Sequence, residues 1–192
     1  ADIALAVVGV GVLLAAALAQ GKRGWVASGL VYAAAALIAT ILVRRDADFG
    51  FIGLMFVLLV VWVTDIGGYF AGRGIGGPKL WPRVSPKKTW AGAIGGLVLA
   101  LVIAAGFALL GFGRMVPLLL LGAVLSVVSQ LGDLFESAVK RRFDVKDSSH
   151  IIPGHGGLLD RLDGFVAAIV VAALIGFTRG GLDGIGRGFM VW

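Results

Sequence analysis

The sequence contains no cysteine, which excludes disulfide bonds, thiolate nucleophiles and cysteine-ligated zinc from the chemistry of this protein. Charge is also scarce, because Asp, Glu, Lys and Arg together make up only 15% of the chain. No hydrophilic linker interrupts the 192 residues. We therefore expect residues 1–192 to form a single domain.

Apolar residues dominate what is present. Hydrophobic residues account for 59% of the sequence and the mean hydropathy is +0.99, whereas soluble domains contain about 45–50% apolar residues. The 31 glycines are typical of membrane helices, in which small residues let backbones approach closely. The net charge of +6 suits anionic lipids or nucleotide phosphates. Nucleic acid is not an expected partner, because the basic residues lie at helix ends and not along a soluble face.

Several apolar segments approach the roughly 20 residues that a helix needs to cross a bilayer. The runs are too long for strands and lack the alternation of a half-buried strand. The sequence therefore predicts an all-α, polytopic membrane helix bundle with about six transmembrane helices. The expected segments are Ile3–Ala19, Trp25–Val43, Phe49–Phe70, Thr89–Leu110, Met115–Arg142 and Leu158–Phe177.

Loop charge predicts the orientation of this bundle. Most lysines and arginines follow the first, third and fifth segments, and basic loops tend to stay in the cytoplasm. We therefore expect the polar loops after the third and fifth segments to face the cytoplasm together. Both chain ends would then lie on the opposite side.

The densest charge lies between the fifth and sixth segments. Asp133, Glu136 and Lys140 are spaced i, i+3 and i+7, so they share one helix face, and Asp160 and Asp163 share another. A hairpin would bring the two faces together at one membrane surface. Carboxylates that meet at a low-dielectric site favour a hard divalent cation, usually Mg²⁺ where phosphates are handled.

The third segment ends with another polar pair, Asp65 and Tyr69, which lie one helical turn apart. An acid inside a membrane segment is usually functional, although Asp65 could also act only as a cap or interfacial residue. The run Gly72–Gly77 fits the pattern G-x-G-x-x-G. No strand is expected before it and no helix opens at its end, so the dinucleotide-binding interpretation fails.

A basic motif, Ser85–Thr89, lies directly before the fourth segment and reads Ser-Pro-Lys-Lys-Thr. The free N–H groups and positive end of a helix attract phosphate. Lys87 and Lys88 add charge, and the hydroxyls of Ser85 and Thr89 add donors. The residues alone are equally consistent with a capped helix flanked by topology-determining lysines.

These motifs resemble a known family, the phosphatidate cytidylyltransferases, which are integral membrane CDP-diacylglycerol synthases. The Ser85–Thr89 motif followed by Gly95-Gly96 is similar to one recurrent motif of the family, and Asp65 before an aromatic is similar to another. The resemblance covers residues 61–163, which should carry the catalytic motifs. The family signature is matched by Ser137, Val139, Lys140-Arg141, Lys146-Asp147, Ser149, Ile152-Pro153, His155-Gly156-Gly157, Leu158 and Asp160-Arg161-Leu162-Asp163.

The resemblance implies transfer of CMP from CTP to phosphatidate, giving CDP-diacylglycerol and pyrophosphate, with Mg²⁺ and room for a second cation. It implies a phospholipid-synthesising enzyme in a bacterial inner membrane, with membrane lipid as a partner. We expect catalytic roles for Asp133, Asp160, Asp163 and Lys140, with the three aspartates also binding the metal. We expect substrate contacts from Asp65, Ser85, Lys87, Lys88, Thr89, Ser137, Arg141, Lys146, Asp147, His155 and Arg161.

Two other functions stay open. A CTP-dependent lipid kinase of the dolichol-kinase type has a similar membrane context and nucleotide, but the complete signature disfavours it. A transporter with acids along a permeation path is the second alternative, although such proteins often show internal repeats and none is visible. CDP-alcohol phosphotransferases are excluded, because their D-G-x-x-A-R run is absent.

A homodimer is also expected. The resemblance implies one, and Gly92, Gly95 and Gly96 would allow close packing between helices of two copies. The same glycines are equally suited to packing between helices of one chain.

Overall fold

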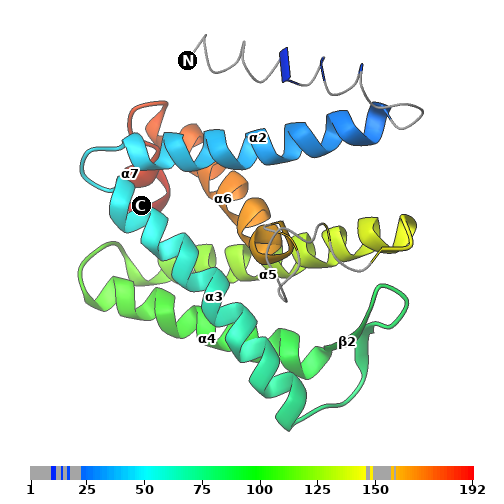
Figure 1. Cartoon of the computed structure of the whole chain (residues 1–192). Helices are drawn as coiled ribbons and strands as arrows, with labels where there is room; N and C mark the ends of the chain where they lie inside the picture. Colours follow the sequence, from blue (N-terminus) through cyan, green and yellow to red (C-terminus); the bar gives the residue numbers. More distant parts are fainter. Residues whose placement is uncertain are drawn as a thin grey trace.

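The computed structural model describes residues 10–11, 14, 17, 23–145, 148, 157 and 159–192, without the side chains of residues 23, 159 and 161. The described part is a helical bundle with one small hairpin (Figure 1). Its elements are α2 (Arg23–Arg45), α3 (Gly50–Gly74), β1 (Lys79–Trp81), β2 (Ser85–Thr89), α4 (Trp90–Leu109), α5 (Met115–Arg142), α6 (Leu159–Gly180) and α7 (Ile185–Met190).

The expected membrane segments are confirmed wherever the structure describes them. Helices α2 to α6 are each long and apolar enough to cross a bilayer, so the protein is an integral membrane protein. The start and end of α5 match the predicted Met115–Arg142. The segment Ile3–Ala19 lies outside the described residues apart from positions 10, 11, 14 and 17.

Glycines bring α3 and α4 into close contact. A Cβ at Gly95 would lie 2.3 Å from the Cβ of Ala71, and one at Gly96 would lie 2.5 Å from the carbonyl oxygen of Thr64. Such distances are far inside van der Waals contact, so these positions require glycine. The glycines of α4 therefore serve packing within the chain, as one of the two sequence interpretations proposed.

The core runs through the middle of the bundle. Phe56 of α3, Leu118 and Leu125 of α5 and Ile169 of α6 are fully buried. Two polar groups also lie inside, where the Thr64 hydroxyl donates to Ser126 Oγ at 2.9 Å. Because each hydroxyl has a partner, the pair joins α3 to α5 without the cost of an unsatisfied polar group.

A β-hairpin and a short C-terminal helix were not expected from the sequence. Strands β1 and β2 form an antiparallel hairpin that pairs Lys79 with Thr89, so Ser85–Thr89 is a strand leading into α4. Helix α7 follows α6 and packs back on the bundle. The buried Asp46 carboxylate accepts the Arg187 N–H at 2.7 Å and so ties the α2–α3 connection to α7.

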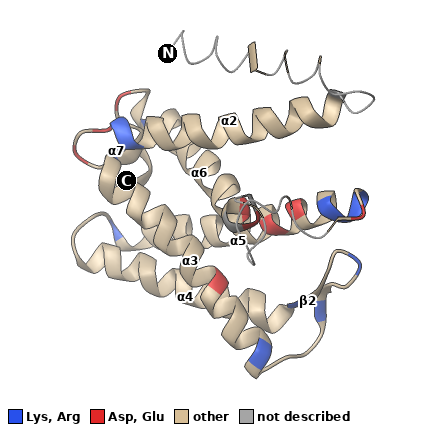
Figure 2. Cartoon of the chain, viewed as in Figure 1, with Lys and Arg blue, Asp and Glu red and all other residues tan. Residues whose placement is uncertain are grey.

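The polar motifs gather at one end of the bundle. The C-terminal ends of α3 and α5, the hairpin and the N-terminal end of α4 lie toward the same side (Figure 1). Figure 2 shows basic residues along the hairpin and at the ends of α3 and α5, with acidic residues further inside. The described parts of the two polar regions therefore lie toward the same side, as expected (Figure 1, Figure 2), and a cytoplasmic location of that side stays a prediction.

Candidate active site

A cavity of about 590 Å³ lies between α3, the hairpin, α4 and α5. Five residues that the sequence predicted as site residues line it: Asp65, Lys87, Lys88, Thr89 and Asp133. The rest of its wall is formed by Thr64, Gly68, Tyr69, Gly72, Arg73, Lys79, Leu80, Gly92, Ala93 and Gln130.

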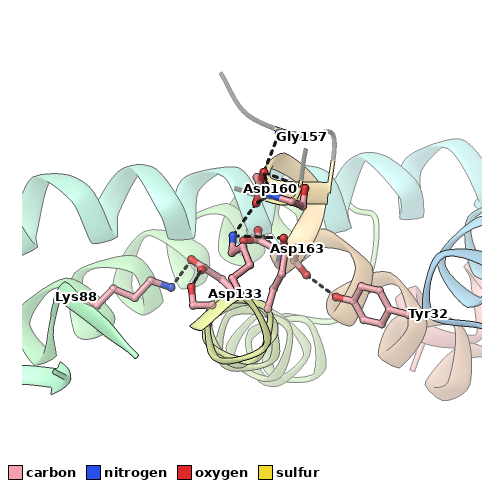
Figure 3. Close-up of polar contacts among 11 residues, drawn as sticks. Tyr32, Lys88, Asp133, Gly157, Asp160 and Asp163 are labelled. Carbon is pink, nitrogen blue, oxygen red and sulfur yellow. Dashed lines mark hydrogen bonds and ion pairs between the residues drawn. The ribbon is translucent and has the colours of Figure 1, made fainter. Parts of the chain in front are cut away.

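An ion pair crosses this cavity. Lys88, carried by β2, donates to Oδ2 of Asp133 on α5 (Figure 3). The side chains of Lys88 and Asp133 are 29% and 27% exposed, so both remain within reach of a ligand. The Ser137 hydroxyl donates to the other Asp133 oxygen at 3.3 Å, from one turn further along α5.

Carboxylates from three helices meet beside this pair. Asp163 of α6 interacts electrostatically with Asp133 and Glu136 of α5 and with Asp65 of α3. The only hydrogen bond to its carboxylate in the described part of the chain comes from the N–H of Gly164 at 2.7 Å. The predicted meeting of the α5 and α6 acidic faces is therefore confirmed.

Asp160 lies in a different environment. Its Oδ1 accepts from Lys140 Nζ at 2.7 Å, and its Oδ2 accepts from the N–H groups of Ser148 and Gly157, each at 2.8 Å (Figure 3). The Ser148 hydroxyl donates to Oδ2 as well. Burial raises the pKa of the Asp160 carboxyl, but the hydrogen bonds from Lys140, Gly157 and Ser148 outweigh it and hold that pKa well below its usual range. Asp160 thus anchors residues on both sides of the loop between α5 and α6.

Glu136 is the least satisfied acid of the group. Its Oε1 lies 3.4 Å from Lys140 Nζ, yet both carboxylate oxygens are buried and neither has a hydrogen-bond partner among the described residues. A buried carboxylate with so few partners can accept hydrogen bonds or bind a cation.

The other predicted site residues have varied positions. Thr89 is the N-cap of α4, and its hydroxyl oxygen accepts from the Gly92 N–H at 3.1 Å. Ser85 pairs with Trp81 in the hairpin and does not line the cavity. Arg141 is exposed on the last turn of α5. Lys146, Asp147 and His155 lie outside the described residues, as does the side chain of Arg161.

Several residues at the site were missed by the sequence interpretation. Tyr69, Arg73, Lys79 and Gln130 line the cavity. Arg73 follows Asp65 and Tyr69 at successive four-residue steps, and that spacing could have placed it on the same face of α3. Tyr32 of α2 donates its hydroxyl to the carbonyl oxygen of Asp163 at 3.3 Å (Figure 3), and no local pattern in the sequence indicated this contact.

The described residues suit a divalent cation in their chemistry. Among the described residues, two lysines form ion pairs with the acids of this region, and the buried oxygens of Glu136 have no hydrogen-bond donor. However, no three Asp, Glu or His side chains surround a common point in the part of the chain that the structure describes. Metal binding by Asp133, Asp160 and Asp163 stays a prediction.

Comparison with known proteins shows what this chain is similar to. The model of the cytidylyltransferase family matches residues 2–178. The chain is 51% identical over 179 residues to a phosphatidate cytidylyltransferase of Brucella suis, with 88% of this chain and 63% of the relative covered. It is 44% identical over 145 residues to the phosphatidate cytidylyltransferase of Bacillus subtilis, with 74% and 54% covered. The chain thus spans less than two thirds of the length of these relatives.

Proposed function

The chain belongs to the cytidylyltransferase family, and we propose that it transfers the cytidylyl group of CTP to phosphatidate, forming CDP-diacylglycerol and pyrophosphate. One observation carries this proposal: a single cavity at one end of membrane-spanning helices is lined by both basic side chains and carboxylates. A lipid substrate needs a site at the membrane, a triphosphate needs cationic donors, and the accompanying metal needs carboxylate oxygens.

The reaction needs no nucleophile from the protein. An oxygen of the lipid phosphate forms the new bond to the α-phosphorus of CTP, and the bond from that phosphorus to the pyrophosphate oxygen breaks. The main obstacle is repulsion between two anions, which preorganised positive charge reduces. Lys88 is already held in the cavity by Asp133, and its ammonium can donate to a phosphate oxygen without leaving that carboxylate's neighbourhood.

The departing pyrophosphate needs cations of its own. Lys140 and Arg141 lie on the last turns of α5, and Lys146 follows them in the chain. We assign these three residues to charge developing on the leaving group. Asp160 and Glu136 hold Lys140 from two sides, and this fixes the direction in which its ammonium can donate.

Mg²⁺, with or without a second cation, is the proposed cofactor. Asp133 and Asp163 would hold it, because both carboxylates border the same acidic cluster. Asp160 is retained as a third ligand from the sequence, although both of its oxygens already accept hydrogen bonds. When bound, the ion would add positive charge to the phosphate oxygens during transfer.

Location and assembly are part of the same proposal. Most lysines and arginines lie at the cavity end of the helices, so we place that end in the cytoplasm and the protein in a bacterial inner membrane. A homodimer is proposed from the family resemblance alone, since the α4 glycines pack against α3 of the same chain. Mass measurement in mild detergent tests it, and a monomer alone would contradict it.

Tracing the label from CTP tests the proposed reaction. Purified protein is supplied with phosphatidate and CTP that carries radioactive phosphorus at either the α or the γ position. We expect α label in the lipid product and γ label in pyrophosphate. A lipid kinase would give the reverse when an alcohol lipid is supplied, with γ label in the lipid and CDP as the second product.

A further inference from the structure

Charged side chains of both signs line the cavity. Asp65 and Asp133 are two of them, and Lys88 is paired with Asp133. Arg73 of α3 and Lys79 and Lys87 of the hairpin are three further cations of the lining. Among the residues that the structure describes, none of these three cations forms an ion pair with a carboxylate. These three residues, named here the basic wall, are therefore suited to an anion.

Arg73 is held in a defined position on the basic wall. Its Nη1 donates to the hydroxyl oxygen of Tyr69 at 2.8 Å, one turn earlier on α3. Its guanidinium carbon also lies 5.9 Å from the centre of the Tyr69 ring. One nitrogen is thus used for positioning, and a guanidinium has five N–H donors in all.

The surface beside the basic wall is apolar and faces outward. On α3, Asp65, Tyr69 and Arg73 follow one another at four-residue steps. Trp62, Ile66 and Phe70 do the same, and Ile66 and Phe70 directly follow Asp65 and Tyr69 in the sequence. The second series, named here the apolar stripe, is 58%, 51% and 68% exposed at its three positions. Residues one apart on a helix lie about 100° apart around its axis, so the apolar stripe borders the cavity face along the membrane-spanning part of α3.

We propose that the basic wall binds the phosphate of the lipid substrate while its acyl chains lie along the apolar stripe. This inference rests on the proposed function and assigns one of its two substrates to a subsite. A lipid phosphate combines a charged head with chains that must stay in the bilayer, and the two adjoining surfaces of α3 match these two parts. CTP has no part that requires the apolar stripe. We assign its triphosphate to Lys88 and the carboxylates instead.

Separate titration of the two substrates tests the assignment. In Arg73→Gln, the KM for phosphatidate in mixed micelles should rise about tenfold, because a charge-assisted hydrogen bond is lost, while the KM for CTP stays within about twofold. Arg114 is an exposed arginine at the other end of the bundle. Arg114→Gln is the matched control and should leave the KM for both substrates unchanged. Three results of Arg73→Gln overturn the proposal. They are a rise in the KM for CTP alone, an equal rise in the KM values for both substrates, and no change in either KM.

A second variant and a binding measurement keep the test decisive. Tyr69→Phe retains the ring and removes only the acceptor that positions Arg73, so it should raise the KM for phosphatidate by a smaller factor. Native mass spectrometry should show wild-type protein retaining phosphatidate over phosphatidylcholine, and Arg73→Gln should lose this preference. Retention without any CDP-diacylglycerol synthesis would reject the proposed function but not the lipid site. If glycerol 3-phosphate competes as well as a short-chain phosphatidate, the apolar stripe is not used and the assignment fails.

Discussion

Lys88 and Asp133 are 45 positions apart in the sequence, yet they form an ion pair across the cavity. The hairpin brings the lysine in from one side, and α5 supplies the carboxylate from the other. The pair brings together a phosphate-binding cation and a metal-binding anion of the proposed reaction. Both groups must acquire new partners when a metal–triphosphate complex enters.

This relationship predicts unequal effects of the two neighbouring lysines. Lys88→Ala removes a cation from the nucleotide part of the cavity and leaves Asp133 without its partner. We expect the KM for CTP to rise roughly 10- to 100-fold, as loss of a hydrogen bond to a charged group of about 1.5–3 kcal/mol implies. Lys87→Ala is the matched control on the same strand, and its main effect should fall on phosphatidate. Steady-state kinetics with each substrate varied would contradict this account if the two variants behaved alike.

Packing between α3 and α4 gives a prediction about stability. Gly96→Ala places a methyl group 2.5 Å from the Thr64 carbonyl oxygen, so the helices must move apart. Overpacking of this kind costs about 1–3 kcal/mol. Gly106→Ala in the same helix is the control, because nothing lies within 4 Å of its added Cβ. Thermal unfolding in detergent should show a lower Tm for the first variant and an unchanged or slightly higher Tm for the second. Equal Tm values would show that the close contact is not required.

The helices were largely predictable because their signal is local. An apolar run of bilayer length predicts a transmembrane helix, because few other structures satisfy its backbone in a membrane. The predicted bounds of α5, Met115 and Arg142, therefore agree with the structure. The acidic faces of α5 and α6 were also predictable, since helical spacing alone placed Asp133 and Asp163 toward a shared surface. The Ser85–Thr89 motif was predicted to hold substrate phosphate, and its Lys87 and Lys88 line the cavity; phosphate binding stays a prediction.

The missing parts depended on contacts between distant segments. The hairpin is short and polar, and its pairing of Lys79 with Thr89 leaves no alternating pattern in the sequence. Tyr32 reaches the site from a helix that carries no charged motif. Thr89 was expected among the phosphate ligands, with a helix cap as the alternative, and the structure shows the cap: its hydroxyl oxygen accepts from the Gly92 N–H at the start of α4.

Asp160 provides a prediction about pH. Its pKa is lowered in the folded protein by its hydrogen-bond donors, so its contribution to stability is complete above the unfolded value of about 3.9 and declines as the pH falls through the folded value. Asp160→Asn should therefore lower the Tm at pH 7. The difference in Tm between this variant and wild type should become smaller below about pH 4. Asp183→Asn, at an exposed position, is the control. A difference that widens on acidification would mean that the folded pKa is not lowered.

The role of Asp133 at the centre of the cavity is tested most directly by one substitution. Pyrophosphate release from CTP and phosphatidate should be measured for wild type, for Asp133→Asn and for Asp48→Asn, an exposed aspartate at the opposite end of the bundle. The account predicts a loss of at least about a thousandfold in Asp133→Asn, as expected when an electrostatic group at the reacting centre is removed, with a Tm close to that of wild type. Asp48→Asn should keep full activity. Turnover in Asp133→Asn within about fivefold of wild type would contradict the placement of the reaction in this cavity.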